Sequence, residues 1–235
     1  MKKVAVIGAG PSGITAIKNF IDEGFDVTAF ERCDGVGGNW RFNDPSGHSS
    51  VFETTHIISS KYTSFYEDYP LPDDASDYPS HKELLSYFNG YAEHFNIKKN
   101  IKFGTEVLSC KQLPNGRWLL KYKHLDGNEE ITLEFDALVV CNGHHHVPRY
   151  PQYKGEFTGE FLHSHDYKRA APFENKRVLV IGGGNSACDV AVETSRISQE
   201  TSLSWRRGYH LVPKFMYGLP ADVFAKRSRW IPQFL

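Results

Sequence analysis

The sequence predicts an α/β fold built on two similar β-α-β units, and two observations carry this prediction. Residues 4–13, "VAVIGAGPSG", run from a short apolar strand into a glycine-rich turn. Residues 178–189, "VLVIGGGNSACD", repeat the pattern. Apolar strands that alternate with amphipathic helices favour a parallel sheet covered on both faces. We therefore expect two Rossmann-like dinucleotide-binding units in a three-layer arrangement, the second of them incomplete.

The first unit opens the chain. Residues 2–7 read as a buried strand, and residues 14–23 carry apolar side chains at helical spacing. Gly24 follows in the position where glycine commonly ends a helix. A second strand at residues 26–30 completes a unit of about 30 residues, the usual size of a β-α-β motif.

A helix and a small antiparallel meander are expected between the two units. Ser80 and Glu83 form a capping box that opens a helix reaching about Phe95. The segment "LPNGRW" has the composition of a hairpin turn. The expected meander strands are residues 101–110, 118–124 and 131–135, and one more buried strand follows at 137–141.

The second unit follows a connecting segment that has no clear periodicity. We expect a strand at residues 177–181, a turn at 182–184, a helix at 185–197 and a strand at 201–205. After Arg207 the chain ends without a third α/β repeat, so we expect this unit to be incomplete.

Composition narrows the classes of function. The net charge of −1 gives no broad field to attract nucleic acid, and no apolar run is long enough to span a membrane. Gly8, Gly10 and Pro11 interrupt the first apolar run too early for a signal peptide. Four separate cysteines without a CxxC pair fit a cytoplasmic protein with free thiols. Adjacent histidines at 144–146 point to alternating sides, so we expect no metal site.

The first glycine-rich turn matches the G-x-G-x-x-G pattern of dinucleotide sites. Gly8 permits the tight turn, Gly10 lets a pyrophosphate approach the backbone, and Gly13 packs the helix on the strand. Glu31, 18 residues after Gly13, ends the next strand, where a carboxylate can accept hydrogen bonds from a ribose. The expected site also includes Pro11, Ser12 and Arg32. The alternative is a plain strand-turn-helix with glycines for tight packing.

The second turn carries the opposite charge at its far end. Gly182 and Gly184 repeat the glycines, and Ala187 takes the third small position. Counting 19 residues on from Ala187 reaches Arg206, which we match to Glu31, and Arg207 follows. Guanidinium groups bind a 2′-phosphate, whereas a carboxylate repels it. Asn185 and Ser186 complete the expected site. The alternative is that the two arginines are a solvated surface pair.

Two such sites in one chain have a chemical reason. A nicotinamide donates hydride, and a flavin is the usual acceptor of that hydride. We therefore expect FAD in a domain spanning residues 1–150 and NADPH in a domain spanning residues 173–235. A linker at residues 151–172 is expected to join them.

At these residues the chain resembles the flavin-containing monooxygenases. The segment "FTGEFLHSHDY" fits that family's signature F-x-G-x-x-x-H-x-x-x-[F/Y] at Phe157, Gly159, His163 and Tyr167. Other matches are Gly38-Asn39-Trp40, which the resemblance places at the flavin, the segment "SFYEDYP", and Ser204 to Arg207. The resemblance extends over essentially the whole chain.

The resemblance implies an FAD- and NADPH-dependent monooxygenase acting on a small molecule and O₂. NADPH reduces the flavin, dioxygen adds to give a flavin C4a-peroxide, and a soft nitrogen or sulfur nucleophile takes one oxygen atom. In the stretch "ETTHIISSK", His56 takes the place of an asparagine that lies near the flavin in many relatives. His56 is thus a candidate catalytic and cofactor-binding residue, and the alternative is a histidine packed in a polar turn.

Of three other interpretations, two stay open and one is excluded. A Baeyer–Villiger monooxygenase is related, but it ends the signature with Trp-Pro where this chain has Tyr167-Lys168. A flavin disulfide reductase needs a cysteine pair that the sequence lacks. Family members are longer than this chain, so a truncated, inactive nucleotide-binding remnant is the third alternative. The state of assembly is open, with a homodimer as one alternative.

Overall fold

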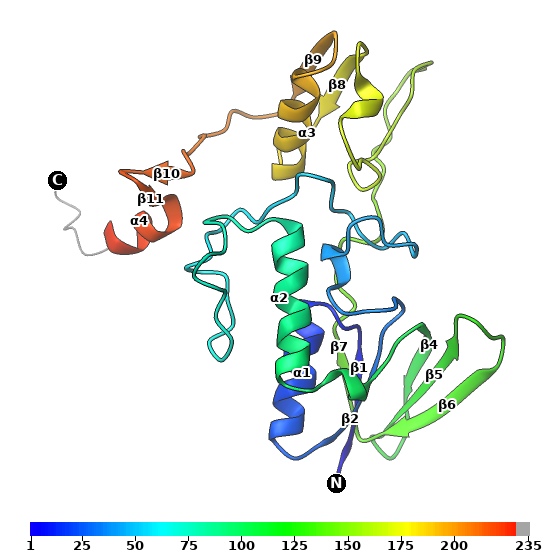
Figure 1. Cartoon of the computed structure of the whole chain (residues 1–235). Helices are drawn as coiled ribbons and strands as arrows, with labels where there is room; N and C mark the ends of the chain where they lie inside the picture. Colours follow the sequence, from blue (N-terminus) through cyan, green and yellow to red (C-terminus); the bar gives the residue numbers. More distant parts are fainter. Residues whose placement is uncertain (229–235) are drawn as a thin grey trace. The chain divides into compact units, whose positions relative to one another are not determined.

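The computed structural model describes residues 1–228 and divides them into two compact units (Figure 1). The first unit contains residues 1–51 and 81–147, and the second contains residues 52–80 and 148–228. The segment 52–80 therefore belongs with the later part of the chain, which linear boundaries at residues 150 and 172 do not anticipate. Residues 229–235 of the expected second domain lie outside the described residues.

A four-stranded parallel sheet organises the first unit. Its strand order is β3-β2-β1-β7, with β1 (Lys3–Ile7) in the interior between β2 (Asp26–Phe30) and β7 (Ala137–Val140). The short strand β3 (Ile101–Lys102) pairs with β2 in parallel. Because β1 has a partner on both edges, the backbone around the first glycine-rich turn is held from two sides.

The sheet of the first unit is covered on both faces, as the sequence predicts. Helix α1 (Pro11–Asp22) packs on β1 and β2, and α2 (His81–His94) contacts α1 on the same side (Figure 1). The meander on the other side consists of β4 (Thr105–Gln112), β5 (Trp118–His124) and β6 (Glu130–Phe135). Between sheet and meander lies an apolar core formed by Ala5, Phe30, Leu120, Tyr122 and Phe135.

Two details of the first unit differ from the prediction. Helix α1 begins at Pro11 rather than Ile14, because Gly10 already has the extended conformation of a cap residue and Pro11 suits the first helical position. The strand expected at residues 101–110 is two strands, since β3 joins the parallel sheet and β4 begins the meander at Thr105. A short apolar run does not show which sheet it will join.

The second unit contains a parallel pair of strands. Strand β8 (Arg177–Ile181) pairs with β9 (Glu200–Ser204), and α3 (Asn185–Ser195) contacts both. Val178 and Val180 are partly buried, whereas Leu179 is 61% and Ile181 is 50% exposed. One face of this pair is therefore covered and the other is open among the described residues, in keeping with an incomplete unit.

A small module follows the second unit's β-α-β motif, and the sequence does not predict it. It consists of the hairpin β10 (Phe215–Met216) and β11 (Leu219–Pro220), followed by α4 (Ala221–Ser228). Asp222 in the first turn of α4 accepts hydrogen bonds from the backbone N–H and the hydroxyl of Ser60, both within 2.9 Å. This contact joins the module to the segment 52–80.

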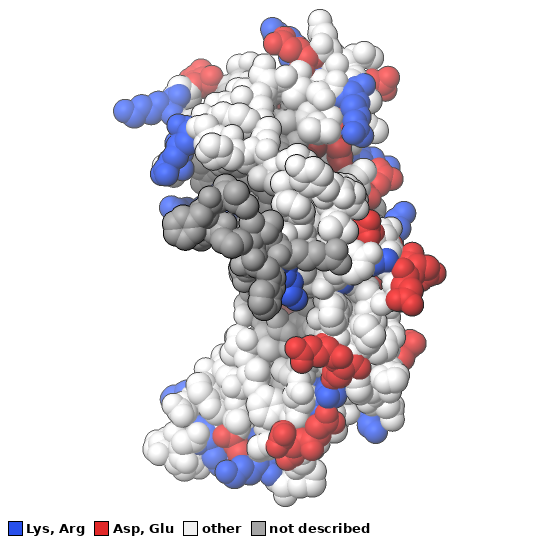
Figure 2. All heavy atoms as spheres, turned by 90° about the vertical axis from the view of Figure 1, so that its left-hand side faces the viewer, with Lys and Arg blue, Asp and Glu red and all other residues white. Residues whose placement is uncertain are grey.

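Charged side chains of both signs are scattered over the face shown in Figure 2. Uncharged surface lies between many of them, and neither sign forms a continuous patch on that face. This distribution agrees with the net charge of −1. In the part of the chain that the structure describes, no helix is both long enough and apolar enough to cross a membrane.

Candidate dinucleotide sites

Steric constraints explain the glycines at the ends of the first turn. Gly8 has a φ of +97°, and a Cβ there would lie 2.5 Å from the carbonyl oxygen of Cys141. The Gly8 N–H donates to the carbonyl of Phe30 at 2.8 Å, which joins the turn to the end of β2. A Cβ on Gly13 would lie 2.0 Å from the Gly8 carbonyl oxygen. These two positions therefore shape the turn itself.

Gly10 has a different environment. A Cβ there would meet only the backbone of Gly38, at 3.6 Å from its Cα, which is ordinary van der Waals contact. No side chain caps the start of α1, and its first turn contains no acidic residue. The helix start therefore keeps N–H groups and a partial positive charge that suit an anion. Contacts within the protein therefore do not require a glycine at this position.

Glu31 has a structural role that the sequence did not reveal. Glu31 is buried, with only 7% of its surface exposed. Its two carboxylate oxygens accept hydrogen bonds from the backbone N–H groups of Ala9 at 2.6 Å and Cys33 at 2.8 Å. The carboxylate thus stabilises the glycine-rich turn directly. Because each carboxylate oxygen has two lone pairs, acceptor capacity remains for a ribose hydroxyl.

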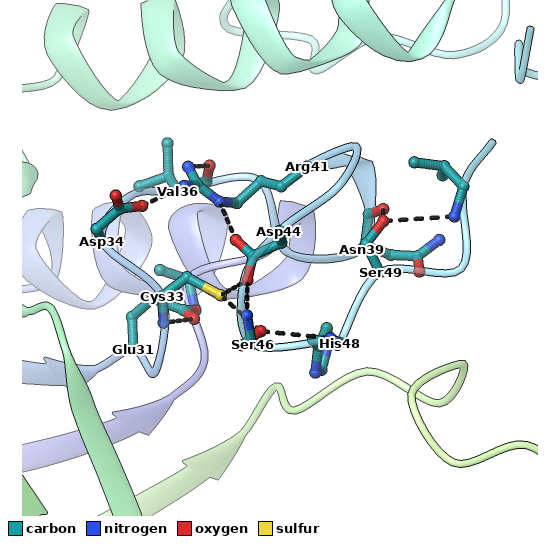
Figure 3. Close-up of polar contacts among 12 residues, drawn as sticks. Glu31, Cys33, Asp34, Val36, Asn39, Arg41, Asp44, Ser46, His48 and Ser49 are labelled. Carbon is teal, nitrogen blue, oxygen red and sulfur yellow. Dashed lines mark hydrogen bonds and ion pairs between the residues drawn. The ribbon is translucent and has the colours of Figure 1, made fainter. Parts of the chain in front are cut away.

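The loop after β2 closes against the first turn (Figure 3). The Gly37 N–H donates to the carbonyl of Ala9 at 3.0 Å, and a Cβ on Gly38 would lie 3.0 Å from the Gly10 Cα. Gly38–Trp40 forms the short helix η1. The Asn39 amide oxygen accepts both the N–H and the hydroxyl of Ser50 at 2.9 Å. The structure therefore brings Gly38 to the turn, with Asn39 and Trp40 next to it in the chain, and the Asn39 side chain holds the loop to Ser50.

The second turn repeats the backbone pattern of the first. The Gly182 N–H donates to the carbonyl of Ser204 at 2.9 Å, and the Cys188 N–H donates to Gly184 at 3.1 Å. The corresponding bonds in the first turn run from Gly8 to Phe30 and from Ile14 to Gly10. Gly184 begins α3 without a side-chain cap, and a Cβ there would meet nothing within 4 Å.

Strand register corrects the residue match between the two sites. Ile7 is paired with Phe30 in the first unit, and Ile181 is paired with Ser204 in the second. The residue that corresponds to Glu31 is therefore Trp205, and Arg206 corresponds to Arg32. The sequence count placed the match one residue too late, because it ran 19 residues from Ala187, whereas Glu31 lies 18 residues after Gly13. Arg206 and Arg207 are both exposed and directly follow the end of β9 and Trp205.

Tyr209 is a part of the second site that sequence reasoning missed. A Cβ on Gly183 would lie 2.2 Å from the Tyr209 hydroxyl, so the tyrosine ring lies directly on the turn. The ring also makes an edge contact with Trp205, with centroids 5.2 Å apart. The middle glycine of "GGG", Gly183, was the available signal, because only Gly182 and Gly184 fit the dinucleotide pattern.

The signature segment is anchored at its last residue. Tyr167 is 2% exposed and donates its hydroxyl to the Glu193 carboxylate on α3 at 2.7 Å. Burial raises the pKa of the Glu193 carboxyl. The rings of Phe52 and Phe173 pack on Tyr167. His163 accepts the His165 N–H through Nδ1 at 3.0 Å, while Phe157 is exposed. The tyrosine thus fixes the signature to the helix that carries the second turn.

His56 lies in the second unit, beside Lys214. The ring Nε2 faces the Lys214 ammonium, and Nδ1 lies 3.2 Å from the carbonyl oxygen of Thr54. Residue 56 also forms an isolated bridge with Ser80. Within residues 1–228 we find no group of three or more histidine, cysteine or acidic side chains that could hold a metal ion.

A family model for flavin-binding monooxygenase-like proteins matches residues 1–232. The chain belongs to this family. Human flavin-containing monooxygenase 2 is 40% identical over 240 residues, which cover 97% of this chain and 44% of the human protein. Dimethylaniline monooxygenase [N-oxide-forming] 2 from Cavia porcellus is 42% identical over 233 residues, covering 94% of this chain and 43% of that protein.

Solved structures of other flavin-binding monooxygenase-like proteins have the same fold. S-allyl-L-cysteine S-oxygenase from Allium sativum is 28% identical with a TM-score of 0.82, and the match covers 93% of this chain and 54% of that one. Tmm from Pelagibacter sp. strain HTCC7211 is 29% identical with a TM-score of 0.80, covering 88% and 51%. These matches confirm the family resemblance and the fold class. The chain spans less than half the length of the curated relatives named above.

Proposed function

We propose that this chain binds FAD at the first turn and NADPH at the second, and that it serves oxygen transfer to a soft nitrogen or sulfur nucleophile. The observation that carries the proposal is the contrast between two turns with the same backbone hydrogen bonds. One is followed by the carboxylate of Glu31, and the other by the guanidinium groups of Arg206 and Arg207. The chemistry for which the relatives are named, S-oxygenation and N-oxide formation, supports this proposal.

At the first site the residues fit an adenosine with a free ribose. Gly10 leaves the backbone open to a pyrophosphate, and the uncapped start of α1, at Pro11, Ser12 and Gly13, supplies favourable charge. Glu31 keeps acceptor capacity for a ribose hydroxyl, with Arg32 beside it. The loop Gly38–Trp40 borders the same turn. The role of this domain, residues 1–150, is to bind and orient the flavin.

At the second site the residues fit a phosphorylated ribose. Gly184, Asn185 and Ser186 form the start of α3, where nothing blocks the backbone at Gly184. Gly182 and Ala187 complete the turn. Arg206 and Arg207 give two guanidinium groups that can pair with a 2′-phosphate. This site, within residues 173–235, binds NADPH, and the signature in residues 151–172 links it to the first.

Bound flavin supplies the redox and oxygen chemistry, with hydride from NADPH. The protein supplies binding, orientation and exclusion of water. His56 is the side chain we propose for a polar contact at the reacting end, because in the family resemblance it takes the place of an asparagine near the flavin; in this structure its Nε2 faces the Lys214 ammonium and its Nδ1 lies 3.2 Å from the Thr54 carbonyl oxygen. We further infer a cytoplasmic location from four free cysteines. A small nucleophile and O₂ are the proposed reactants.

The experiment is a flavin titration of the purified chain followed by turnover. We expect FAD to bind, NADPH to be consumed, and ¹⁸O from labelled dioxygen to appear in the N-oxide of trimethylamine or the sulfoxide of a thioether. A ketone converted to an ester instead supports the Baeyer–Villiger alternative. FAD binding without turnover supports a remnant. Failure to bind FAD at all, in folded protein, overturns the proposal.

A further inference from the structure

Arg41 makes several polar contacts within the loop that follows β2 (Figure 3). Its Nε donates to the Asp44 carboxylate at 2.8 Å, and Nη1 lies 3.5 Å from the carbonyl oxygen of Val36. Nη2 is paired with the carboxylate of Asp34. The Arg41 side chain is 19% exposed and that of Asp44 is 3% exposed, so this ion pair is largely shielded from water. Arg41 thus connects both ends of the loop at residues 34–44.

Two glycines of the loop leave space for the arginine. A Cβ on Gly35 would lie 2.6 Å from Arg41 Nη1. A Cβ on Gly37 would lie 3.4 Å from Arg41 Cγ and 2.5 Å from the Leu85 side chain, and Gly37 has a φ of +119°. Glycines at these two positions therefore leave the space that the Arg41 side chain occupies.

The second oxygen of the Asp44 carboxylate contacts the thiol of Cys33. This Oδ1 accepts the Ser46 N–H at 2.9 Å and the Cys33 thiol at 3.3 Å. Burial raises the pKa of the Cys33 thiol to about 12. Burial alone would raise the pKa of the Asp44 carboxyl, but hydrogen bonds from Arg41 and Ser46 outweigh it and lower that pKa to about 2. Arg41 is thus the counter-charge that keeps Asp44 ionised beside a neutral thiol.

The loop that Arg41 closes is also the loop that meets the first turn. Gly37 donates to Ala9, and Gly38 packs on Gly10. Both glycines lie between Asp34 and Asp44, the two carboxylates that Arg41 holds. We infer that Arg41 is a positioning residue for the first dinucleotide site: its pairing with Asp44 closes residues 34–44 over Cys33 and so holds Gly37–Trp40 against the glycine-rich turn. The identity of the ligand as FAD rests on the proposed function.

Two consequences separate this role from a general effect on folding. Without the guanidinium group, Asp44 is left buried and unpaired, so the loop opens and water reaches Cys33. The thiol then reacts with an alkylating agent, while Cys110, Cys141 and Cys188, which lie outside the loop, keep their rates. FAD affinity falls because Gly38–Trp40 are no longer held in place. NADPH affinity stays unchanged, because no residue of the second turn is involved.

The test compares Arg41→Met and Arg41→Lys with the wild-type chain. The control is Arg117→Met, which removes an arginine paired with two carboxylates, Glu134 at 2.9 Å and Asp136 at 3.3 Å, in the meander of the same unit. The rate of iodoacetamide labelling is measured for each cysteine by peptide mass spectrometry, and the FAD dissociation constant by flavin fluorescence. Circular dichroism and thermal unfolding establish that each variant is folded.

For Arg41→Met we expect Cys33 labelling to accelerate about tenfold or more and FAD affinity to fall about tenfold, since a charge-assisted contact is lost. Arg41→Lys gives a smaller change, and Arg117→Met gives none. If Arg41→Met does not fold, Arg41→Lys carries the test alone. Wild-type labelling of Cys33 and wild-type FAD affinity in the folded Arg41 variants overturn the inference. If the wild-type chain binds no FAD, the proposed function fails, while the labelling rates still decide whether Arg41 closes the loop.

Discussion

The two glycine-rich turns have the same backbone pattern but differ in how firmly they are enclosed. In each turn, the N–H of the first glycine donates to the carbonyl of the last residue of the next strand. The helix then begins directly after Gly10 or Gly184, and no side chain caps its start. The first turn lies at the end of β1, which is paired on both edges. The second lies at the end of β8, which is paired only with β9 among the described residues.

The side chains around the turns differ more than the turns do. The first turn is stabilised by a buried carboxylate, Glu31, and by the loop containing Gly37 and Gly38. The second is bordered by the aromatic ring of Tyr209, and the exposed Arg206 and Arg207 follow the end of β9. A β-α-β motif therefore specifies the turn, while residues outside the motif decide how tightly it is held. The following predictions test that comparison.

Substitutions at the third small residue of each turn, Gly13 and Ala187, should show the largest difference in unfolding free energy. Gly13→Ala places a methyl group 2.0 Å from the Gly8 carbonyl oxygen, so we expect it to destabilise the first unit by about 4 kcal/mol or more. The reverse change in the second turn, Ala187→Gly, should cost only about 1 kcal/mol through lost helix propensity. Chemical denaturation measures both. Equal losses would show that the two turns are equally constrained.

Glu31→Ala should cause the next-largest difference in stability between the two units. It leaves the buried N–H groups of Ala9 and Cys33 without an acceptor, which costs roughly 2–6 kcal/mol. Trp205→Ala, at the matching register position of the second unit, loses an exposed edge contact with Tyr209 worth about 1 kcal/mol. The comparison uses unfolding free energies in the absence of nucleotides. A Glu31→Ala loss below that of Trp205→Ala contradicts the stabilising role of the carboxylate.

The double variant Arg206→Ala/Arg207→Ala should affect binding rather than folding. Both residues are exposed, so we expect a stability change within about 0.5 kcal/mol. NADPH affinity should fall roughly 10- to 150-fold, because a charge-assisted contact contributes about 1.5–3 kcal/mol. NADH affinity should be unchanged. Isothermal titration with both nucleotides checks this, and parallel losses for NADPH and NADH would remove the basis for assigning the 2′-phosphate.

Acid should weaken the first unit through Asp44, the carboxyl of that unit whose pKa is lowered to about 2. The folded-state pKa of Asp44 is lowered from 3.8 to about 2, so its contribution is present above pH 4 and is lost as the pH falls toward 2. The full contribution is roughly 2 kcal/mol. The difference in unfolding free energy between wild type and Asp44→Asn should therefore shrink from pH 6 to pH 3. A constant difference over this range contradicts the lowered pKa.

Gly10→Val should have little effect on folding but block the flavin. A Cβ at Gly10 meets only ordinary contact with Gly38, so the turn can accommodate it, and the side chain would occupy the space where we place the pyrophosphate. Flavin content of the purified variant, compared with its thermal stability, separates the two effects. Normal flavin content would argue against the first turn as the FAD site.

Much of the fold follows from local sequence patterns. Both β-α-β units lie near the predicted residues, and the strands β2 (Asp26–Phe30), β5 (Trp118–His124) and β8 (Arg177–Ile181) match the predicted bounds. The family was also evident from the signature and the glycine-rich turns. In the candidate sites, the sequence identified the glycines and the charges that follow them. It did not identify Tyr209 or Arg41 as parts of the sites.

The sequence by itself determined what depends on neighbouring residues: apolar periodicity, glycines where the backbone turns, and the charge that follows each second strand. Only the tertiary structure decided which groups meet across the chain. It paired the Glu31 carboxylate with the Ala9 N–H and placed β3 beside β2. The physical reason is that hydrogen-bond partners and strand register depend on three-dimensional packing, which a residue count along the chain does not contain.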